Sequence, residues 1–196
     1  MKICLFQGTF NPIHRAHIRI AEFVVNKYNF DKFIFIPAYN PPHKDSRNDY
    51  SFHRLEMVKR AVLNESKFEV SDIEYKRQGV SYTYLTICEL YKLYPECDKI
   101  NFIIGTDAFD KIESWYEVDK LKELVKFIVF IRDENFDVSK YDYLRQKGFD
   151  FEIQSLSFED VSSTELRNCI KTNKSISSYV TEEVEEYIKQ NGLYKD

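Results

Sequence analysis

The sequence predicts an α/β protein: a parallel sheet with helices on both faces and a small helical region at the C-terminus. Three observations lead to this class. Short apolar segments alternate with helical patterns as far as residue 158, which is typical of parallel strands joined by crossover helices. The segments that begin at Ile3, Phe33, Ile100 and Phe127 are apolar throughout, as expected for strands covered on both faces. After residue 158 only helical patterns follow.

The individual elements follow from these patterns in chain order. Strands are predicted at residues 3–6, 33–36, 68–70, 100–104, 127–131 and 151–153. Helices are predicted at residues 17–28, 52–63, 82–94, 141–147, 163–171 and 181–191, with a short helical zone within 108–124. The second strand ends in a proline-rich loop, because proline continues neither strand nor helix there. Ligands bind beyond the carboxyl ends of parallel strands, so we expect Gly8, Pro37, Gly105 and the segment after Ile153 to converge.

Composition describes one ordinary globular domain that spans residues 1–196, with its helical part at about 159–196. The chain is 43% hydrophobic and 31% charged, which is typical of a packed core rather than disorder. The formal net charge of −4 argues against nucleic-acid or membrane partners, which favour basic chains. No apolar stretch approaches the roughly 20 residues that cross a bilayer.

Cysteine usage and the N-terminus indicate the compartment. Cys4, Cys88, Cys97 and Cys169 form no Cys-x-x-Cys pair, and we expect buried or partly buried free thiols, with a structural disulfide as the weaker alternative. The chain starts directly with a strand pattern rather than a signal peptide. Both features predict a cytoplasmic protein.

The first strand and the loop after it carry the strongest functional signal. The strand leads through Gly8, Thr9 and Phe10 to a helix that opens with His14 and His17. The free N–H groups of such a helix N-terminus bind anions, and two histidines three residues apart share one helix face. The pattern favours a phosphate site for phosphoryl or nucleotidyl transfer. Taken singly, the histidines are also compatible with surface or core positions, or with a metal site.

This segment resembles the signature of the nucleotidyltransferase superfamily. That signature reads Gly-x-Phe-x-Pro-x-His-x-Gly-His, and residues 8–17 read Gly-Thr-Phe-Asn-Pro-Ile-His-Arg-Ala-His. The one departure is Ala16, where the family usually has glycine. The resemblance implies that the segment binds ATP and that His14 and His17 are catalytic, contacting the α- and β-phosphates. Thr9 and Phe10 would add hydrogen bonds from the loop.

A second motif, Ser-Ser-Thr-Glu-Leu-Arg, stands at residues 162–167. Serine followed three places on by glutamate predicts a helix cap. The same hydroxyls, the free N–H groups and Arg167 would also form a second oxyanion cradle, and the local sequence favours neither. Nucleotidyltransferases of this group carry a similar segment that holds ATP phosphates. The resemblance therefore assigns Ser163, Thr164 and Arg167 to ATP binding.

Two intermediate segments are ambiguous by themselves. Asp107 follows Gly105 at the end of a strand, where a carboxylate reaches a ribose hydroxyl or only caps the next helix. The resemblance favours ATP binding for both residues. Trp115 is the single tryptophan of the chain, and either packs in the core or offers, with Tyr116, a stacking face to an aromatic ring.

Two further segments suggest where an anionic acceptor binds. Lys44 stands in Pro-Pro-His-Lys on the loop after the second strand, although loop lysines are mostly solvated. Ser81, Tyr82 and Thr83 enter a helix, whose N–H groups either meet a carboxylate or are capped by Ser81.

These segments, in this order, resemble the nicotinate-nucleotide adenylyltransferase family from residue 2 to residue 194. The resemblance implies a Rossmann-like domain that transfers AMP from ATP to nicotinate mononucleotide, giving deamido-NAD and pyrophosphate in NAD biosynthesis. Lys44 would hold the acceptor phosphate. The acceptor's ring and carboxylate would meet Ser81, Tyr82, Thr83, Trp115 and Tyr116. Mg²⁺ would arrive with ATP, because no dense carboxylate cluster is present to bind it alone.

Other functions remain open at this point. Leu85 replaces an aspartate that the family commonly carries after Ser-Tyr-Thr, which leaves nicotinamide mononucleotide or pantetheine phosphate as alternative acceptors. A nucleotide-binding regulator without turnover is the alternative from another class. The intact His14, His17 and Arg167 argue against it.

Overall fold

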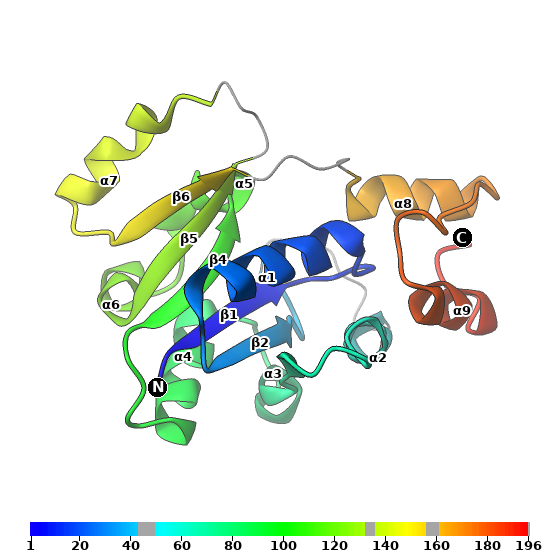
Figure 1. Cartoon of the computed structure of the whole chain (residues 1–196), viewed down its shortest axis with the longest axis horizontal. Helices are drawn as coiled ribbons and strands as arrows, with labels where there is room; N and C mark the ends of the chain where they lie inside the picture. The colour runs from blue at the N-terminus through cyan, green and yellow to red at the C-terminus, as the bar shows by residue number, and fades with distance from the viewer. Residues whose placement is uncertain (43–49, 132–135, 156–160, 196) are drawn as a thin grey trace.

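The computed structural model describes residues 1–42, 50–131, 136–155 and 161–195. Within these ranges, six parallel strands form one sheet in the order β3-β2-β1-β4-β5-β6 (Figure 1). The strands are β1 Ile3–Gly8, β2 Lys32–Pro37, β3 Phe68–Val70, β4 Ile100–Gly105, β5 Val125–Ile131 and β6 Phe151–Ser155. The strand order reverses between β1 and β4, and open parallel sheets bind ligands at the carboxyl ends of the strands on either side of such a reversal.

Helices follow the strands on both faces of the sheet. Their bounds are α1 Arg15–Tyr28, α2 Ser51–Ala61, α3 Ile73–Arg77, α4 Thr83–Leu93, α5 Thr106–Phe109, α6 Val118–Leu124, α7 Asp142–Gln146, α8 Ser163–Lys171 and α9 Glu182–Gln190, with short 3₁₀ helices at Ile112–Ser114 and Val138–Tyr141. None of these helices is long and apolar enough to span a bilayer.

The alternation of side chains along each strand builds two hydrophobic cores. On β1, Cys4 and Phe6 join a core that also contains residues of α1, α2, α8 and α9. Ile3 and Leu5 join the opposite core, with residues of α4, α6 and α7. Successive strand residues point to opposite faces, so a strand covered on both sides must be apolar throughout. In Figure 1, α1 crosses one face of the sheet and α9 lies beside α2.

The structure confirms the predicted class and the position of every predicted strand, most of them extended by one or two residues. Two details differ. The helix α3 was not expected, since its five residues are too few to show a helical period. The zone within 108–124 is broken into α5, a 3₁₀ helix and α6. The four cysteines are free thiols, with Cys4 buried and the others partly buried, as predicted.

Candidate active site

The loop after β1 is shaped by a close contact between Gly8 and Phe10. The Phe10 backbone lies in the left-handed region, with φ of 48°, and its ring folds back over β1. A Cβ atom built on Gly8 would lie 2.9 Å from Cζ of Phe10, closer than real Cβ atoms come to a neighbour. Glycine at position 8 therefore permits the Phe10 ring, which is only 3% exposed, to fill this space.

The two histidines meet at the start of α1. His14 is the N-cap residue, and its backbone N–H donates to Nδ1 of His17 (3.2 Å). The two rings lie 3.7 Å apart between centroids, and Phe10 packs edge-on against His17. Because Nδ1 of His17 accepts this hydrogen bond, the neutral ring carries its proton on Nε2. His17 thus presents an N–H donor that the packing holds in a fixed orientation.

Helix α8 docks on this same loop. The Ser163 hydroxyl donates to the carbonyl oxygen of Pro12 (3.0 Å), and Nη1 of Arg167 donates to the carbonyl oxygen of Asn11 (2.8 Å). A further nitrogen of Arg167 donates to Oγ1 of Thr164 (3.1 Å). The two motifs that lie some 150 residues apart in the sequence therefore meet at one edge of the sheet.

The start of α8 is a capping box, which confirms the capping interpretation for Ser162. The Ser162 hydroxyl accepts from the Glu165 N–H (3.2 Å), and Glu165 Oε2 accepts from the Ser162 N–H (2.7 Å). Ser163, in contrast, directs its hydroxyl hydrogen to Pro12. A phosphate contact by Ser163 stays a prediction, and its observed contact is with the loop.

Gly105 and Asp107 lie at the end of β4, the strand beside β1 in the sheet. The register of β1 and β4, continued to the strand ends, puts Gly105 level with Gly8. A Cβ built on Gly105 would meet no atom of the described residues within 4 Å. Gly105 itself is the N-cap of α5, so the alternative in which Asp107 is the cap is wrong. Asp107 is exposed in the first turn of that helix.

The predicted acceptor side consists of the loop after β2, the start of α4, Trp115 and Tyr116. There, Ser81 does not cap α4, whose N-cap is Tyr82. Ser81 is buried, and its hydroxyl accepts from the backbone N–H of Asn40 (2.8 Å). The Ser81 N–H donates to the Asn40 carbonyl oxygen (2.9 Å). The backbone N–H and carbonyl oxygen of Asn40 thus both bond to Ser81, and these two bonds hold the start of α4 against the loop after β2.

The aromatic residues of the acceptor side divide between core and surface. Tyr82 stacks on Tyr116, with ring centroids 4.5 Å apart, and Tyr116 is 47% exposed. Trp115 is half-buried and packs edge-on against Phe102, so its ring contributes to the core. Leu85 is half-buried, and Ala16 is buried in the first turn of α1. Lys44 lies outside the described residues.

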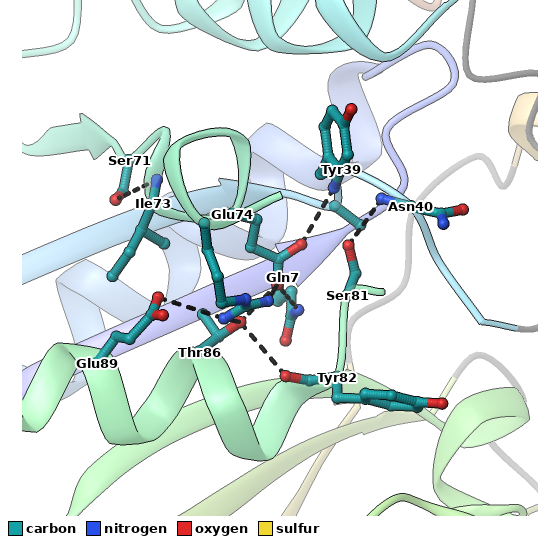
Figure 2. Close-up of polar contacts among 12 residues, drawn as sticks. Gln7, Tyr39, Asn40, Ser71, Ile73, Glu74, Ser81, Tyr82, Thr86 and Glu89 are labelled. Carbon is teal, nitrogen blue, oxygen red and sulfur yellow. Dashed lines mark hydrogen bonds and ion pairs between the residues drawn. The ribbon is translucent and has the colours of Figure 1, made fainter. Parts of the chain in front are cut away.

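A buried polar cluster connects the two sides, and sequence reasoning missed it. The Glu74 carboxylate on α3 is fully buried. It accepts from the Gln7 amide (2.6 Å) and the Thr86 hydroxyl (2.6 Å) through Oε1, and from the Tyr39 N–H (3.1 Å) through Oε2 (Figure 2). Nothing local in the sequence marks Glu74, because α3 is too short for a buried face to be recognised.

A second buried charge supports the loop after β2. Arg54 on α2 donates to the carbonyl oxygens of Ala38 (2.6 Å) and Tyr39 (2.9 Å). Burial lowers the pKa of the Arg54 guanidinium from its usual value, although arginine is still protonated at neutral pH. Burial also raises the pKa of Tyr75 to about 12, so its phenol keeps its proton and donates to the Ser51 carbonyl oxygen (2.7 Å).

Comparisons with known proteins decide the family. A family model described as cytidylyltransferase-like matches residues 5–169. A probable nicotinate-nucleotide adenylyltransferase of Clostridium botulinum (strain Kyoto / Type A2) is 39% identical over 194 residues, 96% of each chain. Another, of Staphylococcus epidermidis, is 39% identical over 199 residues, which cover 100% of this chain and 98% of the relative. The chain belongs to the nicotinate-nucleotide adenylyltransferase family.

Solved structures show the same fold. The nicotinic acid mononucleotide adenylyltransferase of Plasmodium falciparum complexed with NaAD superposes with a TM-score of 0.77, at 24% identity, over 98% of this chain and 97% of that one. Its complex with APC gives a TM-score of 0.76 at 23% identity, over 98% and 96% of the two chains. This chain therefore has the same Rossmann-like fold as these solved structures.

In this family member, the site residues form two groups joined through β1. One group contains the β1 loop, the histidine pair and α8, which are in direct contact. The other contains the loop after β2, the start of α4 and Tyr116. Gln7, the residue before Gly8, reaches from the first group to Glu74 in the second.

Proposed function

We propose that this protein transfers AMP from ATP to nicotinate mononucleotide, forming deamido-NAD and releasing pyrophosphate. The observation that carries the proposal is the contact of Arg167 and Ser163 with the loop that precedes the histidine pair. This contact puts a guanidinium, a helix N-terminus and the two histidines at one edge of the sheet, as a triphosphate requires. The full-length similarity to nicotinate-nucleotide adenylyltransferases supports the same reaction.

The reaction needs alignment and charge stabilisation more than a protein base. An oxygen of the acceptor's 5′-phosphate, already ionised at neutral pH, forms a bond to the α-phosphorus of ATP. The bond from that phosphorus to the bridging oxygen breaks, and its electron pair leaves with pyrophosphate. Donors that are fixed in place stabilise the charge that spreads over the α-phosphate.

The ATP side supplies these donors. In this proposal His17, whose ring is oriented by the hydrogen bond from the His14 N–H to its Nδ1, donates from Nε2 to the phosphates. In this proposal Arg167 and the N–H groups of Ser163 and Thr164 bind the departing pyrophosphate, since the Glu165 N–H is taken by the Ser162 hydroxyl. The open space in front of Gly105 lets a nucleotide approach the end of β4 closely, with Asp107 available to a ribose hydroxyl.

Magnesium belongs to the substrate in this proposal. Among the described residues, no group of three or more His, Cys, Asp or Glu side chains is placed to hold a metal ion. Phosphate oxygens bind Mg²⁺ readily, so the ion enters with ATP as MgATP.

The start of α4 favours the acid over the amide as acceptor. Thr83 and Tyr84 begin the helix, and the N–H groups of the first helical residues have no carbonyl four residues back within the helix to bond; the next N–H, of Leu85, donates to the Tyr82 carbonyl oxygen (3.1 Å). The Ser81 hydroxyl is committed to Asn40, so it does not compete for them. A carboxylate satisfies such donors with both oxygens, whereas an amide would oppose them with its own NH₂. Tyr116 offers its exposed ring to a pyridine ring, which adds affinity without selecting between the two.

In this proposal residues 1–196 form a single nucleotidyltransferase domain. The C-terminal helices α8 and α9 share a hydrophobic core with α1 and α2. Tyr194 also donates to the Asn11 side chain (2.6 Å). The helical region thus contacts the loop after β1 directly.

The proposal is tested by mixing ATP with each acceptor and measuring pyrophosphate release and the dinucleotide formed. We expect kcat/KM for nicotinate mononucleotide to exceed that for nicotinamide mononucleotide by at least about 100-fold. Equal use of the two would contradict the proposed binding of the acceptor's carboxylate by the N–H groups at the start of α4. Pantetheine phosphate should give no product. ATP binding without turnover on any acceptor would favour a nucleotide-binding regulator.

A further inference from the structure

We infer that Glu74 is a positioning residue for the acceptor side of the site. Its carboxylate holds the loop after β2 and the start of α4 against the end of β1. The inference rests on the proposed function, because it concerns the acceptor that this function assigns to α4. Glu74 touches no substrate in this account and acts through the residues that it anchors.

The carboxylate receives hydrogen bonds from three separate elements. Gln7 donates from β1, Tyr39 from the loop after β2, and Thr86 from α4. Figure 2 shows these three donors converging on Glu74. A fully buried carboxylate is costly unless its oxygens accept hydrogen bonds, so a displacement of any one element leaves a buried charge less well satisfied. The cluster therefore resists relative movement of the three elements.

The anchored residues are direct neighbours of the acceptor side. Asn40, next to Tyr39, exchanges two hydrogen bonds with Ser81. Thr86 lies one turn after Tyr82, and its hydroxyl contacts both Glu74 (2.6 Å) and the Tyr82 carbonyl oxygen (3.4 Å). Through these two arms, Glu74 sets the place of the α4 first turn relative to Gln7, the neighbour of Gly8.

Charge compensation comes from two arginines. Arg77, one turn along α3, lies 3.7 Å from Oε1 of Glu74 and also pairs with Glu89 on α4 (3.3 Å). Arg54 attracts the carboxylate from α2 while it holds the carbonyl oxygens on either side of the Tyr39 N–H. The loop after β2 is thus held by an anion at its N–H group and by a cation at its carbonyl groups.

Replacement by glutamine tests the carboxylate at nearly constant volume. In Glu74→Gln, one oxygen becomes an NH₂ group and the charge is lost. An NH₂ group toward Tyr39 opposes its N–H, and an NH₂ group toward Gln7 and Thr86 requires their side chains to turn and accept instead of donate. We expect KM for nicotinate mononucleotide to rise about 10-fold, the usual effect of losing a hydrogen bond to a charged group. KM for ATP should stay within about 2-fold of the wild-type value and kcat within about 3-fold, because the loop after β1 keeps its own contacts with α8.

Three further variants separate positioning from folding. Glu89→Gln removes a carboxylate from the same cluster without touching the loop after β2, and should leave the acceptor KM near that of the wild type. Thr86→Val removes one donor to Glu74, together with an acceptor for Arg77 (3.1 Å), while keeping the shape of the side chain, and should raise the acceptor KM. Thr86→Ser keeps the hydroxyl and should leave the acceptor KM near that of the wild type. This pair decides the matter even if Glu74→Gln does not fold.

The inference is overturned if the acceptor KM is unchanged in both Glu74→Gln and Thr86→Val. It is also overturned if kcat and both KM values change together, as a purely structural role predicts. The wild-type reaction is measured first. If the wild type uses a different phosphate acceptor, the function proposed above fails on its own, and the same comparison is then made with the acceptor that it does use.

Discussion

At the scale of single residues, the donor on His17 depends on a backbone contact. The His14 N–H occupies Nδ1 of His17, so the neutral ring has its remaining proton on Nε2. Phe6 and Phe10 pack against the same ring, which keeps it from turning. A histidine fixed in this way offers a donor whose direction is set before substrate arrives, and this preorganisation is what stabilises a developing charge.

We predict that His17→Ala lowers kcat by about 100-fold, in the range of a lost oxyanion donor, with a smaller effect on ATP binding. Steady-state kinetics and calorimetric ATP titration check the two parts separately. His53→Ala is the matched control, since His53 bonds to Tyr187 between α2 and α9 (2.9 Å). A near-normal kcat in folded His17→Ala would remove the residue from catalysis.

At the scale of elements, α8 has two functions at one place. Its first turn carries the N–H groups and hydroxyls of the proposed phosphate cradle, and its Ser163 and Arg167 side chains hold the Pro12 and Asn11 carbonyl oxygens. The loop after β1 is therefore shaped by a helix that comes more than 140 residues later. Loss of Arg167 would remove its contact with the loop and, with it, the proposed contact with the phosphates.

We predict that Arg167→Ala raises KM for ATP by about 10-fold or more, because charge-assisted hydrogen bonds are the strong ones, and lowers kcat as well. Arg167→Lys should recover little, since an ammonium group does not bridge Asn11 and Thr164 as the guanidinium does. Arg145→Ala on α7 serves as the control, because Arg145 contacts Phe151 at the far edge of the sheet. Unchanged ATP kinetics in Arg167→Ala would leave the motif as a helix cap only.

At the scale of the whole molecule, ion pairs on several elements make the free energy of unfolding depend on pH in the acidic range. A hydrogen bond from Lys76 lowers the pKa of Asp72 at the start of α3. Hydrogen bonds from Lys189 and Ser177 lower the pKa of Glu185 in α9. A carboxyl with a lowered pKa in the folded state stabilises the protein above its unfolded pKa of about 4. That contribution disappears as pH falls through the folded pKa.

We predict that the free energy of unfolding by urea is nearly constant between about pH 6 and 7 and decreases below about pH 4.5. The decrease should be gradual, because each partly exposed pair contributes only about 0–1 kcal/mol. Glu185→Gln should lose less stability between pH 7 and pH 3 than the wild type, whereas Glu186→Gln, an exposed residue of the same helix, should follow the wild type. Stability that rises on acidification would contradict this account.

The sequence by itself determined the class of fold, the six strands and the residues that resemble the family's motifs. These features are local: a doubly covered strand must be apolar along its whole length, and the Gly8–His17 and Ser162–Arg167 segments carry their patterns within a few residues. A helical or extended period is visible wherever an element is long enough to repeat it. For that reason β3 was predicted at its observed bounds while α3 was missed.

Only the tertiary structure decided what those residues touch. Whether Ser81 caps α4 or ties Asn40, whether Trp115 faces substrate or core, and that Glu74 is buried at all depend on which elements become neighbours. The order of strands brings Gln7, Tyr39 and Thr86 to one carboxylate, although they stand more than 30 residues apart in the chain. A hydrogen bond depends on distance and direction in space, and the path of the chain between two residues sets both.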